Sequence, residues 1–114
     1  MSSSSVFANC VSGNCNNGYG TFESSSGGVY IGMHKNKKAE GLGAYYYKNG
    51  DIYIGEHRNN QMHGRGEITY YNGDTYVGEF KRNKFDGQGM YTHYDKALEV
   101  ERGVWKNGNL IEEN

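Results

Sequence analysis

The chain has 114 residues and no proline, and its apolar runs are only a few residues long. Such short runs exclude a membrane-spanning helix. Although 18 residues are glycine, the lack of proline and of a Gly-X-Y period excludes a collagen-like chain. Large aliphatic residues and phenylalanine make up roughly 16% of the chain, too few for an ordinary aliphatic core. The 16 aromatic residues and the net charge of −1, however, are not typical of a disordered linker.

Charge and cysteine content narrow the function classes further. The 12 basic and 13 acidic residues nearly cancel, which predicts no strong attraction to nucleic acid. Residues 1–5 are polar and serine-rich, so we expect a disordered N-terminus that is not a secretory signal. We therefore favour reduced thiols at Cys10 and Cys15 in a cytoplasmic protein, whereas an exported chain could pair them in a disulfide. A metal site would need more ligands than this pair offers, and we expect no cofactor.

A repeat of 23 residues organises the chain. When the repeats are aligned, Tyr30, Tyr53 and Tyr76 share one column, and Phe7 extends this column by one unit toward the N-terminus. Four further columns hold 14 of the 18 glycines, namely Gly18, Gly41, Gly64 and Gly87; Gly20, Gly43, Gly66 and Gly89; Gly27, Gly50 and Gly73; and Gly32, Gly55 and Gly78. This regularity indicates a stack of near-identical units in which each unit contacts its neighbours.

Each unit reads as a β-hairpin. In one unit, residues 43–48 are rich in tyrosine and residues 51–57 alternate with period two. Asn49-Gly50 lies between these segments, and Asn72-Gly73 repeats it one period later; such pairs favour hairpin turns because both residues tolerate positive φ. No segment has a helix-length amphipathic pattern. The sequence therefore predicts an all-β meander of hairpins.

The spacing also suggests how such a sheet is stabilised. Gly41 and Gly43 alternate in phase with Tyr45 and Tyr47, which predicts that all four face the same side. Glycine weakens a strand unless another group approaches its backbone closely, and we expect that group to be a neighbouring tyrosine ring. Rings over glycine could replace the missing aliphatic core. The glycines to which we assign this structural role are Gly18, Gly20, Gly41, Gly43, Gly55, Gly64, Gly66, Gly78, Gly87 and Gly89.

Three segments carry a family resemblance: Tyr30-Ile-Gly32, Tyr53-Ile-Gly55-Glu56 and Tyr76-Val-Gly78-Glu79-Phe80, each followed nine residues on by Gly-x-Gly. They resemble MORN repeats (membrane occupation and recognition nexus). The resemblance covers nearly the whole chain and implies an elongated, twisted single-layer antiparallel sheet. We divide the chain into the N-terminus at 1–5, a degenerate half-repeat or cap at 6–17, a four-hairpin array at 18–109 and a C-terminal tail at 110–114. Within the array, Gly103-Val-Trp105 matches the pattern only after a two-residue insertion.

The four histidines are candidate catalytic residues, but the residues that share their columns in the aligned repeats argue against that role. His34 and His57 share a column with Phe80, and His93 shares one with Tyr47 and Tyr70, so these positions predict aromatic packing. His63 is expected in a polar loop between hairpins. Each Gly-x-Gly is followed by a strand, not by the helix that a phosphate-binding loop needs. We expect no catalytic residue and no enzyme activity.

The periodicity does create two surfaces. A basic edge is predicted where loops one period apart stack. It would attract acidic headgroups or an acidic partner. Alternatively it is an ordinary solvated edge, because acidic residues lie in the same loops, namely Glu40, Glu56, Glu79 and Asp86. Its residues are Lys35, Lys37, Lys38, Arg58, Lys81, Arg82 and Lys84. An aromatic face is the second surface, and its rings either serve the sheet's own packing or line a groove for a partner segment. Its residues are Phe22, Tyr45, Tyr47, Tyr53, Tyr70, Tyr76, Tyr91 and Trp105.

The leading interpretation is a non-enzymatic interaction or scaffold module that docks a partner segment on the aromatic face. The resemblance implies an adaptor in a cytoskeletal, ciliary or membrane-associated assembly. The alternative is peripheral binding of phosphoinositides or other anionic lipids, because junctophilins and plant phosphatidylinositol phosphate kinases contain MORN repeats linked to membranes. MORN arrays also precede kinase or methyltransferase domains, but we expect no room for one here, so a catalytic role would belong to a partner.

Overall fold

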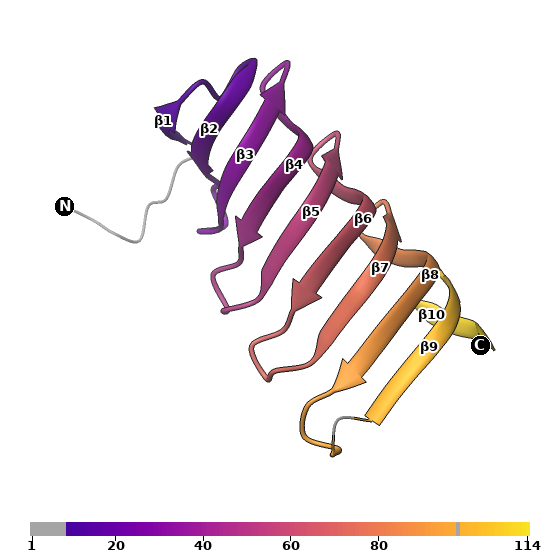
Figure 1. Ribbon diagram of the computed structural model, residues 1–114. Coiled ribbons are helices and arrows are strands. Elements are labelled where there is room, and N and C mark those ends of the chain that lie inside the picture. Colours follow the sequence, from indigo (N-terminus) through magenta and orange to yellow (C-terminus); the bar gives the residue numbers. More distant parts are fainter. Residues whose placement is uncertain (1–8, 98) are drawn as a thin grey trace.

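The computed structural model describes residues 9–97 and 99–114, and the predictions for residues 1–5 and Phe7 lie outside them. The described residues form one antiparallel sheet of ten strands in sequence order (Figure 1). The strands are β1 (Asn9–Gly13), β2 (Gly18–Glu23), β3 (Val29–Lys35), β4 (Lys38–Tyr46), β5 (Ile52–Arg58), β6 (Gln61–Thr69), β7 (Thr75–Lys81), β8 (Lys84–His93), β9 (Glu99–Lys106) and β10 (Asn109–Glu113). The predicted all-β meander is confirmed. No helix in these two ranges is long and apolar enough to cross a membrane.

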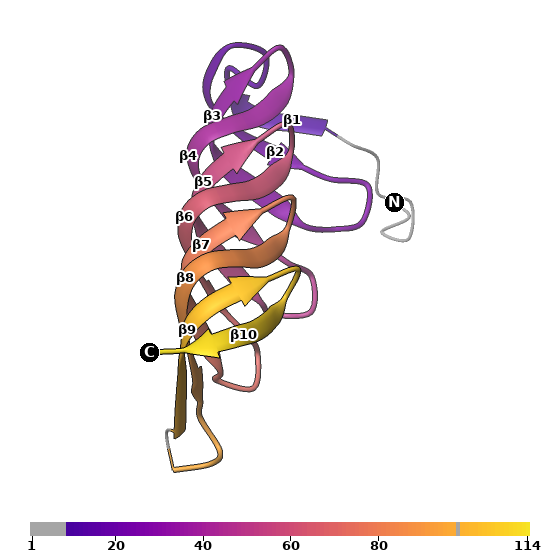
Figure 2. The same cartoon turned by 90° about the vertical axis from the view of Figure 1, so that its right-hand side faces the viewer.

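The sheet is elongated and bent into a trough. Its principal-axis extents are 47 × 29 × 18 Å. Ten strands spaced about 4.8 Å apart account for roughly 43 Å of the long axis. Seen from the side, the strands are strongly curved, so one surface of the single layer is concave and the other convex (Figure 2).

Two kinds of turn alternate along the sheet. At the tight-turn edge, pairs of residues with positive φ form two-residue hairpins of the type I′ class. These pairs are Asn36-Lys37, Asn59-Asn60, Arg82-Asn83 and Asn107-Gly108. At the opposite loop edge, Asn49-Gly50 turns the chain as predicted, within a longer loop in which Tyr47 N–H donates to the Asp51 carbonyl (2.9 Å). The tightest hairpins therefore lie where the sequence suggested loops between hairpins.

In β4, β6 and β8 the first glycine of the Gly-x-Gly lies in a β-bulge, whereas β2, which holds Gly18, pairs with β3 without a register shift. Gly41 has a φ of 93°, and the register of β3 against β4 shifts beside it, between Gly32 and His34. A Cβ on Gly41 would point toward the exposed Met33 on the convex face. The prediction that Gly41 faces the same side as Gly43 is therefore wrong, because the left-handed backbone of the bulge reverses its direction.

In β4, β6 and β8 the second glycine of the Gly-x-Gly lies beneath a tyrosine ring, whereas a Cβ on Gly20 would meet Asn14 and the sulfur of Cys15. A Cβ on Gly66 would come within 2.5 Å of Cε1 in the Tyr53 ring. Tyr30 covers Gly43 and Tyr76 covers Gly89 in the same way. The ring is held in place because the Tyr53 hydroxyl donates to the carbonyl of Glu56 at 2.7 Å. The predicted packing of rings over glycine backbone is confirmed for the second glycines of β4, β6 and β8.

Aromatic side chains supply the core of the concave face in the second half of the sheet. Tyr76 is fully buried, with the Phe85 ring stacked on it at 3.8 Å between centroids and Trp105 edge-on at 5.5 Å. The buried cluster consists of Tyr53, Met62, Ile68, Tyr76, Phe80 and Trp105. Four of these six side chains are aromatic, and only Met62 and Ile68 are not. A chain poor in aliphatic residues can therefore still form a core.

Alkaline titration should expose this dependence on buried tyrosines. Burial raises the pKa of Tyr30 and of Tyr76 to about 12, above the usual value of about 10. Since the folded state disfavours the phenolate, the stability that the neutral rings contribute is complete below pH 10 and is lost as the pH rises from 10 toward 12. We expect tyrosinate absorbance of these rings to appear together with unfolding in that window. Ionisation of Tyr30 and Tyr76 near pH 10 while the protein stays folded would contradict this.

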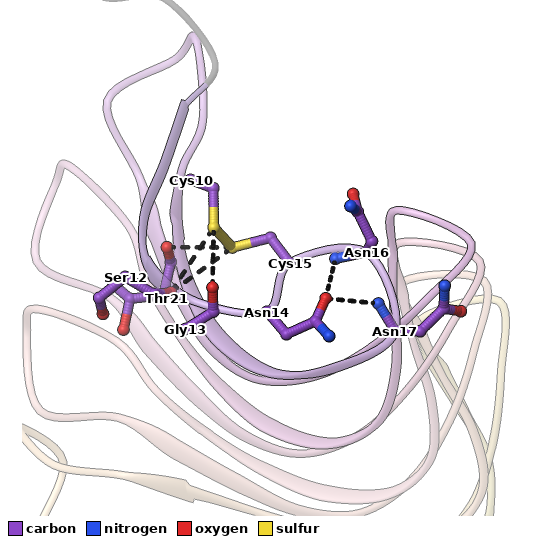
Figure 3. Close-up of a disulfide and its surroundings, with 8 residues drawn as sticks. All are labelled: Cys10, Ser12, Gly13, Asn14, Cys15, Asn16, Asn17 and Thr21. Carbon is purple, nitrogen blue, oxygen red and sulfur yellow. Dashed lines mark hydrogen bonds between the residues drawn. A yellow bond between two sulfur atoms is a disulfide. The ribbon is translucent and has the colours of Figure 1, made fainter.

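Both ends of the sheet differ from the sequence expectation. Cys10 and Cys15 form a disulfide with an S–S distance of 2.08 Å, so the favoured interpretation of two reduced thiols is wrong for this structure (Figure 3). The turn between β1 and β2 brings their Cα atoms to 5.9 Å, and Asn14 Oδ1 fixes it by accepting the N–H groups of Asn16 and Asn17. At the other end, β10 pairs with β9 through Glu113, so residues 110–113 belong to the sheet and are not a tail beyond it.

Candidate functional site

The structure divides the predicted aromatic face into buried and accessible rings. Tyr53, Tyr76 and Trp105 are at most 5% exposed and pack inside the sheet's own core. Their assignment to partner binding is therefore corrected, because neighbouring rings already cover them. The other five rings are half-buried on the concave face, since a single-layer sheet has no second layer above them: Phe22, Tyr45, Tyr47, Tyr70 and Tyr91.

Two histidines occupy aromatic positions in the first half of the concave face, as predicted. His57 lies edge-on to Tyr30 at 4.7 Å and to Tyr53 at 5.0 Å between ring centroids. His34 is similarly edge-on to Tyr30. Burial lowers the pKa of His57, which keeps its ring neutral at pH 7. Three buried ring nitrogens have no hydrogen-bond partner among the described residues: His34 Nδ1, His57 Nδ1 and His57 Nε2.

These histidines border a hollow on the concave face, which we call the N-terminal hollow. Its volume is about 330 Å³. It is lined by Phe22, Ser24, Ser25, Tyr30, His34, Lys37, Ala39, Tyr45, His57 and Asn60. This hollow combines aromatic walls with the unpartnered histidine nitrogens, an arrangement that suits binding of an amphipathic group.

His93 lies at the far end of the concave face in a cluster of satisfied polar groups. Its Nε2 is 2.8 Å from Glu101 Oε2. Asp74 accepts the backbone N–H of Tyr94 and the hydroxyl of Tyr91, both near 2.9 Å, and these bonds lower the pKa of its carboxyl. Each polar group here has a structural partner, and no set of three potential metal ligands gathers within residues 9–97 and 99–114. His63 lies on β6 rather than in the predicted loop.

The structure brings the predicted basic edge together at the tight turns, where all seven of its side chains are exposed. Lys35 pairs directly across the turn with Lys38, and Lys81 pairs with Lys84. Among the described residues no lysine or arginine forms an ion pair. Three nearby acids are instead bonded to backbone N–H groups: Glu40 to that of Asn59, Glu56 to that of Arg65 and Glu79 to that of Gln88. The edge is therefore a row of cations that also includes Glu40, and no ion pair joins a cation to a carboxylate there among the described residues.

Sequence reasoning missed a third surface, on the convex face. Leu42 and Ile54 are 66% and 58% exposed there, and Met33 is 42% exposed. The period-two alternation placed isoleucine and tyrosine on opposite faces of the strand. It did not say which face is concave, and so it could not identify the exposed one.

The family model for the MORN repeat matches residues 17–29, 30–52, 53–75 and 76–97. A search of curated proteins found no match to the chain. The matched segments 30–52, 53–75 and 76–97 each contain a tyrosine that covers a glycine on the adjacent strand and one of the tight hairpins. MORN repeats are in general protein- or membrane-interaction modules. By its repeats and by its single antiparallel sheet, the chain belongs to the MORN-repeat family.

Proposed function

We propose that the chain is a non-enzymatic, cytoplasmic scaffold module that docks a segment of a protein partner on its concave face. The proposal includes membership of a larger cytoskeletal, ciliary or membrane-associated assembly. The observation that supports it most is the set of five half-buried aromatic rings that flank the N-terminal hollow and the core cluster. Tyrosine is enriched at binding hot spots because it buries a large, rigid ring and keeps a polar tip.

A comparison of neighbouring tyrosines tests this proposal. Tyr47 and Tyr70 lie on the concave face, whereas Tyr46 and Tyr71 are exposed elsewhere. We expect the double variant Tyr47→Ser and Tyr70→Ser to lose its partners in an affinity pull-down read by mass spectrometry. The matched variant Tyr46→Ser and Tyr71→Ser should retain them, with circular dichroism confirming that both remain folded. Recovery of the same partners by both variants would exclude docking on the Tyr47 and Tyr70 rings of the concave face.

A second candidate is binding of anionic phospholipid headgroups along the basic edge. Lysines directly opposite one another repel, and among the described residues no carboxylate forms an ion pair with them, so an anion would relieve the repulsion. Each basic residue near an anionic membrane contributes about 1 kcal/mol. We expect salt-sensitive co-sedimentation with phosphoinositide vesicles that is lost when Lys35, Lys37, Lys38, Lys81, Arg82 and Lys84 are replaced by glutamine. Replacing Lys48 and Lys96, away from this edge, should have no effect; equal loss there would argue against a specific edge.

A further inference from the structure

The repeat itself shows what the N-terminal hollow lacks. Ala39, Met62 and Phe85 occupy the same position in successive units. Phe85 stacks on Tyr76 with the ring planes 5° apart, and Met62 is buried in the cluster with Tyr53. In the first unit this position holds only the methyl group of Ala39, so nothing comparable fills the space near Tyr30. A second position changes in the same direction, because Ser24 stands where later units have Tyr47 and Tyr70.

The polar atoms of the hollow are also incomplete. His34 and His57 are each 6% exposed, and both line it. In later units their column is occupied by Phe80 and Trp105, which carry no unpaired nitrogen, since Trp105 Nε1 donates to the Gly89 carbonyl at 3.0 Å. A buried polar group normally has a hydrogen-bond partner. These three histidine nitrogens are closed off from solvent, and the hollow beside the two rings lacks the side chains that Met62 and Phe85 supply in later units.

We propose that the N-terminal hollow binds one tyrosine or tryptophan side chain of an acidic partner segment. This inference rests on the proposed function and specifies the partner's chemistry. The incoming ring takes the place that Phe85 has in the third unit, and it packs against the histidine rings as Phe85 packs edge-on to Phe80. Lys37 lines the hollow, and Lys38 and Arg58 lie at the adjoining edge beside Glu40. None of these three cations forms an ion pair within the part of the chain that the structure describes, so carboxylates flanking the aromatic residue complement the excess positive charge of the mouth.

Filling the hollow from within provides the test. Ala39→Phe reproduces the side chain of the third unit, whereas Ala44→Phe makes the same change on the same strand but away from the hollow. The ligand is the peptide N-acetyl-Glu-Trp-Glu-amide, with N-acetyl-Glu-Leu-Glu-amide for comparison. Binding is measured by titration calorimetry and by NMR shifts of the His34 and His57 ring signals.

We expect the tryptophan peptide to shift both histidine signals and to bind more tightly than the leucine peptide. Ala39→Phe should weaken binding at least about tenfold, Lys37→Glu about threefold, and Ala44→Phe less than twofold. If Ala39→Phe misfolds, Ala39→Met, which copies the second unit, replaces it. Unshifted histidine signals, or equal binding by folded Ala39→Phe protein, would overturn the inference.

The pull-down with the Tyr47 and Tyr70 variant distinguishes failure of this inference from failure of the proposed function. Loss of partners from the Tyr47 and Tyr70 variant, with no peptide bound at the hollow, overturns only the pocket for an aromatic side chain. Peptide binding at the hollow, with all partners retained by that variant, supports the pocket and places partner contact away from Tyr47 and Tyr70.

Discussion

Replacing Tyr76 with alanine should lower the free energy of unfolding by about 4 kcal/mol. The ring is fully buried, it is stacked on Phe85 and lies edge-on to Trp105, and its hydroxyl donates to the carbonyl of Glu79 at 2.9 Å. Truncation removes these contacts and leaves a cavity that a single-layer sheet cannot fill from a second layer. Urea unfolding followed by circular dichroism measures the loss.

Two companion variants divide this effect into its parts. Tyr76→Phe keeps the ring and removes only the hydroxyl, so we expect a loss of about 1 kcal/mol. Tyr94→Ala removes a ring that is 63% exposed, and its effect should be within about 0.5 kcal/mol. If Tyr76→Ala cost no more than Tyr94→Ala, the aromatic core would not be the main source of stability. The same burial makes Tyr53 and Tyr76 unsuitable for tests of partner binding, because their loss would lower the stability of the whole sheet as well.

Replacing Gly66 with alanine is expected to cost about 3 kcal/mol, although it adds a single methyl group. The new Cβ would lie 2.5 Å from Cε1 and 2.6 Å from Cζ of the Tyr53 ring. That ring is fully buried and its hydroxyl is bonded to Glu56, so it cannot move away cheaply. The loss is measured by the same unfolding experiment.

A double-mutant cycle isolates the contact between ring and glycine. In a Tyr53→Leu background the far ring atoms are absent, so adding Gly66→Ala should cost about 1 kcal/mol or less. Ile54→Ala, which changes an exposed side chain on the convex face, should be nearly neutral. Equal costs of Gly66→Ala in both backgrounds would mean that the penalty arises in the backbone and not from the ring.

The 23-residue period could be read from the sequence because each unit solves the same packing problem. The ring of Tyr53 lies so close to the backbone of the adjacent strand that only a glycine, Gly66, leaves room for it. The tyrosine and the glycine therefore recur together in each unit. The aromatic nature of the positions at His34 and His57 followed from their column for the same reason. The positions of the type I′ turns could have been found too, because asparagine recurs there and tolerates positive φ.

Other features depend on curvature and on contacts between units, which a period does not encode. Alternation separates Tyr53 from Ile54, but only the bend of the sheet makes the tyrosine side concave and buries it to 0% exposure. The bulge turns Gly41 away from its expected face because one backbone dihedral is positive.

Pairing of Cys10 with Cys15 follows from a turn that brings their Cα atoms to 5.9 Å, which spacing alone left open. The N-terminal hollow arises because Ser24, Ala39 and His57, from three separate segments, surround one volume. The sequence by itself thus determined the repeat, the strands and the ring-over-glycine contacts, since these are local and repeated. Only the tertiary structure decided which rings are accessible and where the cavity lies, because accessibility depends on what neighbouring units place above each residue.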